Sequence, residues 1–124
     1  MAKTKIEELK QARKIILKEM DIMEEIVGTP NYLIAPATAA KVLGISLQAM
    51  EQRMVKDPII IKKVYETFEK RMLSGGLIRD HFENKVNHLE ETFESLGAYD
   101  SLAVERIVDY ANRLEKRRDI YPPD

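Results

Sequence analysis

The chain has 124 residues, the length of one small domain, and its apolar fraction of 44% is enough to build a hydrophobic core. It contains no cysteine, which excludes disulfides, thiolate metal sites and a cysteine nucleophile. The net charge of −1 argues against a chain that coats nucleic acid non-specifically through its overall charge.

The N-terminal segment MAKTKIEELKQARK is charged throughout. It lacks the apolar core of a signal peptide, and no segment approaches the roughly 18 apolar residues of a membrane span. We therefore expect a soluble, cytoplasmic protein with no membrane partner.

Residues 4–27 are expected to form a long amphipathic helix, because apolar side chains recur at three- and four-residue steps. These side chains are Ile6, Leu9, Ile16, Met20, Met23 and Val27. Two series among them have seven-residue spacing, although Arg13 interrupts one. The pattern leaves two interpretations open: a helix packed on its own domain, or a coiled-coil helix that dimerises. Residues 28–31 end the helix, and residues 32–34 follow as a short extended piece.

Two short helical patterns come next and meet at Gly44. Pro36 suits the first turn of a helix over 36–43, and Gly44 can take the positive φ that commonly ends a helix. Ser46 can cap a second helix, roughly 47–56, by accepting a hydrogen bond from an unpaired backbone N–H.

Helices joined by so short a turn must cross steeply, which requires small side chains at the crossing. Ala39 and Ala40 supply them. The apolar residues expected to hold the second helix against the first are Leu43, Ile45, Met50 and Met54. Together these features predict a helix-turn-helix over residues 36–56.

The segment AAKVLGIS over 39–46, followed by Met50, resembles the helix-turn-helix of phage repressors and of excisionase- or MerR-like regulators. The shared pattern is an alanine four residues before the turn glycine, a leucine before it, an aliphatic residue after it, and a serine cap. An apolar residue six positions after the glycine completes it. The resemblance covers residues 36–56 and none of the flanking helices.

The resemblance implies that residues 46–56 form a recognition helix that lies in the major groove of double-stranded DNA. The residues that it places on base edges are Ser46, Leu47, Gln48, Glu51 and Gln52. A glutamine can pair with adenine and a leucine can touch a thymine methyl, whereas the glutamate could accept from cytosine or simply repel phosphate. Lys41, Arg53 and Lys56 would contact phosphates and set the register.

The charge distribution agrees with this placement. Residues 36–63 hold five basic and two acidic side chains, whereas residues 77–100 hold two basic and six acidic ones. The acidic stretch favours an oligomerisation or partner surface over contact with DNA.

Asp57 and Pro58 form another helix start signal. The residues that then follow helical spacing are Ile61, Val64, Tyr65, Phe68 and Met72. We therefore expect a helix from 58 up to a break at 74–76. The β-branched run at 59–61 leaves a short strand of a wing, at 59–62, as the alternative.

A long helix over 77–96 is expected next, ended by Gly97. Asp100 or Ser101 should cap a last helix that runs to about residue 118. His81 and His88 flank the apolar face of the first of these helices, but no Glu-x-x-His pattern accompanies them. We expect no metal site, no cofactor, no catalytic residue and no enzyme activity.

These observations predict an all-α single domain over 1–124 with about six helices. Its parts are an N-terminal amphipathic helix (4–27), the helix-turn-helix (36–56) and a helical oligomerisation or partner region (58–118). The predicted function is sequence-specific binding of double-stranded DNA, as a small transcriptional or mobile-element regulator that forms a homo-oligomer, with a dimer favoured. Two alternatives are a phage DNA-packaging recognition subunit of the small-terminase kind and a helical protein-interaction module that does not bind DNA.

Overall fold

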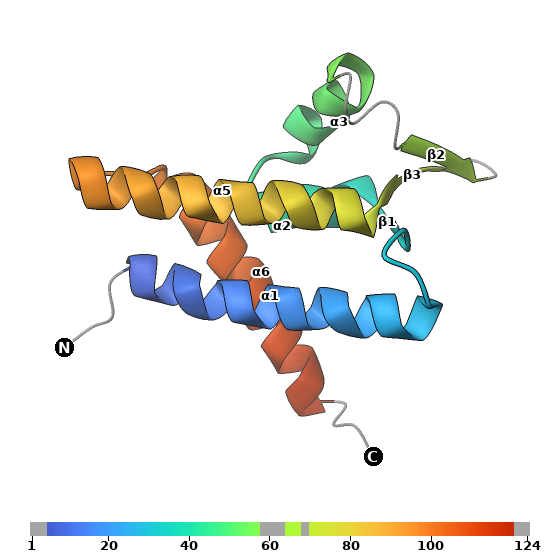
Figure 1. Ribbon diagram of the computed structural model, residues 1–124, viewed down its shortest axis with the longest axis horizontal. Coiled ribbons are helices and arrows are strands. Elements are labelled where there is room, and N and C mark those ends of the chain that lie inside the picture. Colours follow the sequence, from blue (N-terminus) through green and yellow to red (C-terminus); the bar gives the residue numbers. More distant parts are fainter. Residues whose placement is uncertain (1–4, 58–63, 68–69, 121–124) are drawn as a thin grey trace.

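The computed structural model describes residues 5–57, 64–67 and 70–120 (Figure 1). Within these ranges it contains five helices and one antiparallel sheet of three short strands. The helices are α1 (Lys5–Val27), α2 (Pro36–Leu43), α3 (Leu47–Lys56), α5 (Gly75–Leu96) and α6 (Ser101–Ile120). The strands are β1 (Leu33–Ile34), β2 (Val64–Thr67) and β3 (Lys70–Ser74). The fold is thus mostly helical, as predicted, with a small sheet in addition.

Helix α1 buries its apolar face within its own domain. It packs against α6 and, to a lesser extent, α5, and Figure 1 shows α6 crossing α1 obliquely. The buried residues of α1 are Ile6, Leu9, Ala12, Ile16 and Met20. Val27, which the periodicity assigned to the same face, is 50% exposed. Because α5 and α6 cover this apolar face, α1 is a helix packed on its own domain, the first of the two interpretations.

The helix predicted from residue 58 onward is wrong wherever the structure describes that segment. Residues 64–67 and 70–74 are strands β2 and β3, which pair antiparallel with Val64 opposite Leu73 and Thr67 opposite Lys70. Strand β1 pairs with the other edge of β3, so the strand order is β1-β3-β2. The alternative position of a wing strand, 59–62, lies outside the described residues.

The physical reason for the error is that helical spacing alone could not show a pairing partner distant in sequence. Leu33 and Ile34 lie opposite Ser74 and Leu73, about forty positions away in the sequence. Valine, tyrosine and threonine, which favour strands, are also concentrated in β2. Strand β3 thus pairs with both β1 and β2, and these pairings hold residues 64–67 and 70–74 in the extended conformation.

Helix α2 lies at the centre of the fold, where it contacts α3, α5, α6 and β3. Ala39 and Ala40 on α2 are 0% and 2% exposed, as close helix crossing requires. The largest fully buried side chains around it are Leu9, Ile16, Leu43, Met50, Leu73, Ile78, Phe82 and Ile107. These residues come from every described helix and from β3, so one hydrophobic core joins the five described helices and β3.

The two C-terminal helices form where they were expected. Helix α5 ends at Gly97, which has φ +66°. The Asp100 carboxylate accepts a hydrogen bond from the Ala103 N–H at 3.1 Å, so Asp100 rather than Ser101 caps α6. The predicted break at residues 74–76 coincides with the passage from β3 into α5, which begins at Gly75.

Candidate nucleic-acid interface

Helices α2 and α3 and the three residues between them are called the α2–α3 corner below (residues 36–56). Gly44 ends α2 with φ +69°, and its N–H donates to the Lys41 carbonyl at 3.2 Å. The Ile45 N–H donates to the Ala40 carbonyl at 3.0 Å. These two bonds satisfy two of the carbonyls in the last turn of α2, and the left-handed Gly44 lets the chain reverse direction within three residues.

Helix α3 begins at a capped and exposed end. The Ser46 hydroxyl accepts a hydrogen bond from the Ala49 N–H at 3.1 Å, which confirms the predicted cap. Met50 and Met54, 0% and 6% exposed, are the two buried residues of α3 and hold it against the core. The other face of the helix is therefore left to solvent.

All of the residues predicted to contact bases lie at the surface. Ser46, Leu47, Gln48, Glu51 and Gln52 are exposed. Gln48, Gln52 and Lys56 follow one another at four-residue steps, so they form a line on the side of α3 opposite Met50 and Met54. The predicted phosphate contacts Lys41, Arg53 and Lys56 are exposed as well.

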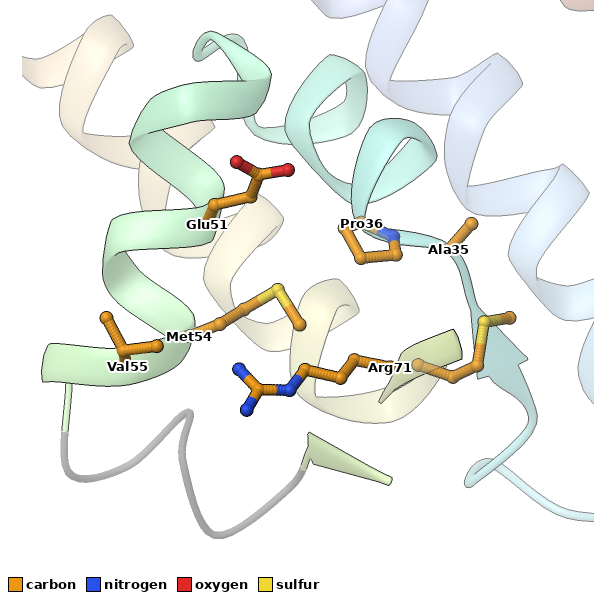
Figure 2. A pocket seen from close by; sticks show the side chains of 7 residues that line it. Ala35, Pro36, Glu51, Met54, Val55 and Arg71 are labelled. Atoms are coloured by element: carbon orange, nitrogen blue, oxygen red, sulfur yellow. The ribbon is translucent and has the colours of Figure 1, made fainter. Parts of the chain in front are cut away.

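Two hollows flank this line of residues. The larger one, of about 500 Å³, lies between α3, the start of α2 and β3. Figure 2 shows Glu51, Met54 and Val55 of α3 along one side and the Arg71 side chain extending from β3 toward them. Glu51 therefore lies on the flank of α3 nearest α2 and the sheet, rather than on the outermost line.

The second hollow is shallow and lies on the opposite flank of α3. Gln52, Arg53, Lys56 and Asp57 line it together with Ala49. Arg53 and Lys56, two of the three predicted phosphate contacts, thus border one depression, whereas Lys41 comes from α2. The last turn of α3 carries both of these cations, where they also complement the helix dipole.

Two surface residues near α3 were not singled out by sequence reasoning. Val55 is 56% exposed, and its position seven residues after Gln48 could have placed it on the same side of the helix. Arg71 is exposed and borders the larger hollow from β3. No sequence signal could have found Arg71, because the segment around it was expected to be helical.

The α2–α3 corner rests on α6. Arg106 of α6 donates to the Gly44 carbonyl at 3.5 Å, and Gly44 itself lies against Ala103. The turn at Gly44 thus contacts α6 in two ways, through the Ala103 backbone and through the Arg106 side chain. This arrangement fixes the position of α3 relative to the helical core.

A cluster of charges ties α1 to α5. The Arg79 guanidinium pairs with Asp21, with Glu24 at 3.7 Å and with Glu83 at 3.5 Å. The hydrogen bond that Arg79 donates to the Asp21 carboxylate is the main cause that raises the pKa of Arg79 above its ordinary value. Part of the acidic excess on α5 and α1 is thus neutralised within the fold.

The two histidines of α5 do not gather with other ligands. His81 is half-buried and His88 is exposed, and within the described ranges no group of three His, Cys, Asp or Glu side chains could hold a metal ion. In the same part of the chain, no helix is both long enough and apolar enough to cross a membrane.

Comparison of the chain with family models, with curated proteins and with solved structures gave no match.

Proposed function

We propose that the α2–α3 corner is a helix-turn-helix and that the protein binds double-stranded DNA with sequence preference through α3. The observation that carries this proposal is the line of Gln48, Gln52 and Lys56 on the solvent side of a short, capped helix. Amide side chains can read adenine in the major groove, and a cation at the end of the line can hold a phosphate.

The support beneath the corner suits a reader of base edges. Recognition requires that side chains are held at a fixed angle to the rest of the domain. The Gly44 turn, the buried Met50 and Met54, and the Arg106 contact hold α3 in one orientation. Strand β3 borders the larger hollow through Arg71 and Met72 and pairs with β2, and this pair of strands is the candidate for a wing in the proposed helix-turn-helix domain.

The phosphate contacts in this proposal are Lys41, Arg53 and Lys56, and the base contacts are Ser46, Leu47, Gln48, Glu51 and Gln52. Three cations make a modest electrostatic contribution, since each phosphate contact adds only one step to the salt dependence of binding. A single module of this size therefore gains useful affinity from a second copy on a symmetric site, and a homodimer that acts as a transcriptional or mobile-element regulator is the form we propose.

The experiment is selection from a pool of random duplex DNA at low and at near-physiological salt, followed by sequencing. We expect one motif to be enriched at both salt concentrations, with two half-sites about one helical turn apart. If no duplex is retained even at low salt, the proposal is wrong. Light scattering of the same sample separates a dimeric regulator from a ring of many copies, the state expected of a packaging recognition subunit.

One observation favours a second function, a protein-interaction module. Leu47 and Val55 are 45% and 56% exposed on α3, and an apolar contact surface would use such residues. Substitution of Val55 alone by serine should weaken binding of a protein partner and leave every proposed DNA contact, Leu47 included, intact. Retention of DNA binding in that variant, with motif selection unchanged, would favour the DNA-reading function.

A further inference from the structure

The guanidinium that contacts the turn of the α2–α3 corner has no carboxylate partner among the described residues. Arg106 of α6 is half-buried, and within the described part of the chain its polar contact is the hydrogen bond that it donates to the Gly44 carbonyl at 3.5 Å. A guanidinium carries five N–H donors, and a hydrogen bond of this length is at the weak limit. Most of the hydrogen-bonding capacity of Arg106 is therefore unused in that part of the fold.

Two other arginines of the C-terminal helices have a different environment. Arg79 of α5 pairs with three carboxylates, and Arg113 of α6 pairs with the Asp109 carboxylate at 3.1 Å. Charged side chains that lose part of their contact with water are usually paired with an opposite charge. Arg106 has lost part of that contact, but its partner is an uncharged carbonyl. An anion supplied by another molecule would complete this pairing.

The position of Arg106 favours a phosphate of bound DNA as that anion. Gly44 comes two residues before Ser46, the first proposed base contact, and three residues after Lys41, a proposed phosphate contact. The planar guanidinium matches the geometry of phosphate oxygens and can donate two hydrogen bonds to them. Because the bond to the Gly44 carbonyl already restricts the side chain of Arg106, less rotamer freedom is lost when a phosphate binds.

We propose that Arg106 contacts a backbone phosphate of the bound duplex, so that the nucleic-acid interface continues from the α2–α3 corner onto the first turns of α6. The inference rests on the proposed function and adds a fourth phosphate contact to Lys41, Arg53 and Lys56. Phosphate contacts fix the register of a protein on DNA but carry no direct sequence information. Arg106 should therefore set the affinity and the salt dependence of binding and leave the choice of bases unchanged.

The test is fluorescence anisotropy of the full chain with the selected duplex and with a scrambled duplex, over a series of salt concentrations. Arg106→Gln keeps a donor for the Gly44 carbonyl and removes the charge. We expect it to weaken binding of both duplexes about five- to tenfold at about 0.1 M salt. It should also lower, by about one, the slope of the logarithm of the binding constant against the logarithm of salt concentration. Arg106→Lys keeps the charge and should keep the slope.

Arg113→Gln is the matched control. Arg113 lies seven residues further along α6 and is paired with Asp109, so its substitution makes the same change in net charge at a greater distance from Gly44. This variant should bind both duplexes like the unmodified chain. Equal weakening by Arg106→Gln and Arg113→Gln would reveal an effect of net charge alone and would overturn the proposal.

A purely structural role for Arg106 would give a different result. If Arg106 only held the turn in place, Arg106→Lys and Arg106→Gln would both weaken binding of the selected duplex more than that of the scrambled one. The salt slope would then be unchanged, and the phosphate contact would be wrong. The proposed function fails separately: if the unmodified chain retains no duplex, both proposals are wrong. Sequence-selective binding with an unchanged slope in Arg106→Gln overturns the contact by Arg106 alone.

A direct measurement on the unmodified chain does not depend on the folding of any variant. The side-chain Nε–H signal of Arg106 is followed by NMR in the isotope-labelled protein while either duplex is added. We expect this signal to shift with both duplexes, whereas the Nε–H signal of Arg113 stays in place. An Arg106 signal that does not move at a saturating concentration of the selected duplex would contradict the proposal.

Discussion

Gly44, at the turn between α2 and α3, lies directly against the backbone of Ala103 in α6. A Cβ atom added at Gly44 would be 2.7 Å from the Ala103 carbonyl oxygen and 3.1 Å from the Ala103 Cα. The φ of +69° at Gly44 is also one that side-chain-bearing residues rarely adopt. Two independent causes therefore require glycine at this turn.

We expect Gly44→Ala to lower the free energy of unfolding by more than 2 kcal/mol, because about 1–2 kcal/mol for the left-handed backbone is added to a steric clash with another helix. Gly97→Ala is the matched control. Its φ is +66°, but no atom lies within 4 Å of the added Cβ, so it should cost about 1 kcal/mol. Urea denaturation measures both. Equal losses of unfolding free energy in the two variants would show that contact with α6 does not restrict the residue at position 44.

Tyr32 carries a buried hydroxyl that finds no hydrogen-bond partner among the described residues. Its ring packs against the start of α5, where a Cβ on Gly75 would fall 2.2 Å from the ring. A buried hydroxyl without a partner gives up its bonds to water and gains none, so its removal carries no penalty. We expect Tyr32→Phe at pH 7 to leave the free energy of unfolding unchanged or raise it by up to about 1 kcal/mol. A loss above 1 kcal/mol would reveal a partner.

The same residue should make stability depend on alkaline pH. Burial is the main cause that raises the pKa of Tyr32 from 10.0 to about 12, and the Arg79 cation opposes it. The folded state thus holds this proton more tightly than the unfolded state. The resulting stabilisation is complete below pH 10 and is lost as the pH rises from 10 toward 12. The stability of Tyr32→Phe relative to the unmodified chain should therefore increase over that range, and a constant difference would contradict the assignment.

Arg79 bridges α1 and α5 and is less exposed than an ordinary surface ion pair. Its side chain is 29% exposed, whereas both partners of the Arg113–Asp109 pair are 60% exposed. We expect Arg79→Met to lower the free energy of unfolding by about 1 kcal/mol, and Arg113→Met by close to zero. Added salt should narrow the difference between the two variants. Identical losses would mean that the Arg79 cluster contributes no more than a solvated pair.

Within the proposed function, Gln48 and Lys56 have different roles on the same face of α3. Gln48→Ala should reduce the preference for the selected motif over a scrambled duplex by about 1–3 kcal/mol. Lys56→Ala should weaken binding of both duplexes alike. It should also lower, by about one, the slope of the logarithm of the binding constant against the logarithm of salt concentration. Fluorescence anisotropy at several salt concentrations measures both quantities, with the exposed Gln11→Ala as control. If Gln48→Ala weakened binding of the selected and the scrambled duplex equally, Gln48 would not be a base contact.

The local signals in the sequence were reliable where one residue type has one physical role. Gly44 and Gly97 end helices with positive φ, Ser46 and Asp100 cap the helices that follow, and the α2–α3 corner has the predicted bounds. The exposure of the proposed DNA contacts on α3 also followed from helical periodicity, once Met50 and Met54 were assigned to the core.

The sheet could not be predicted in the same way, because it depends on pairing between segments far apart in sequence. Leu73 is fully buried opposite Ile34 and Val64, and its neighbours on those strands become evident only in the folded chain. The contribution of Arg71 to the larger hollow depends on the same long-range packing. The helical spacing of Val64, Tyr65 and Met72 was therefore a misleading signal, because these residues lie in β2 and β3.

The most direct test of the central claim is an NMR titration of the isotope-labelled protein with the duplex selected from the random pool. The proposed function predicts that the largest amide shifts fall within residues 46–56 and that Lys41 is also affected, whereas the α5 surface is unchanged. Shifts that cluster outside the α2–α3 corner would contradict the assignment of α3 as a DNA-reading helix. The same conclusion would follow if the selected duplex caused no more amide shifts than a scrambled duplex at the same concentration.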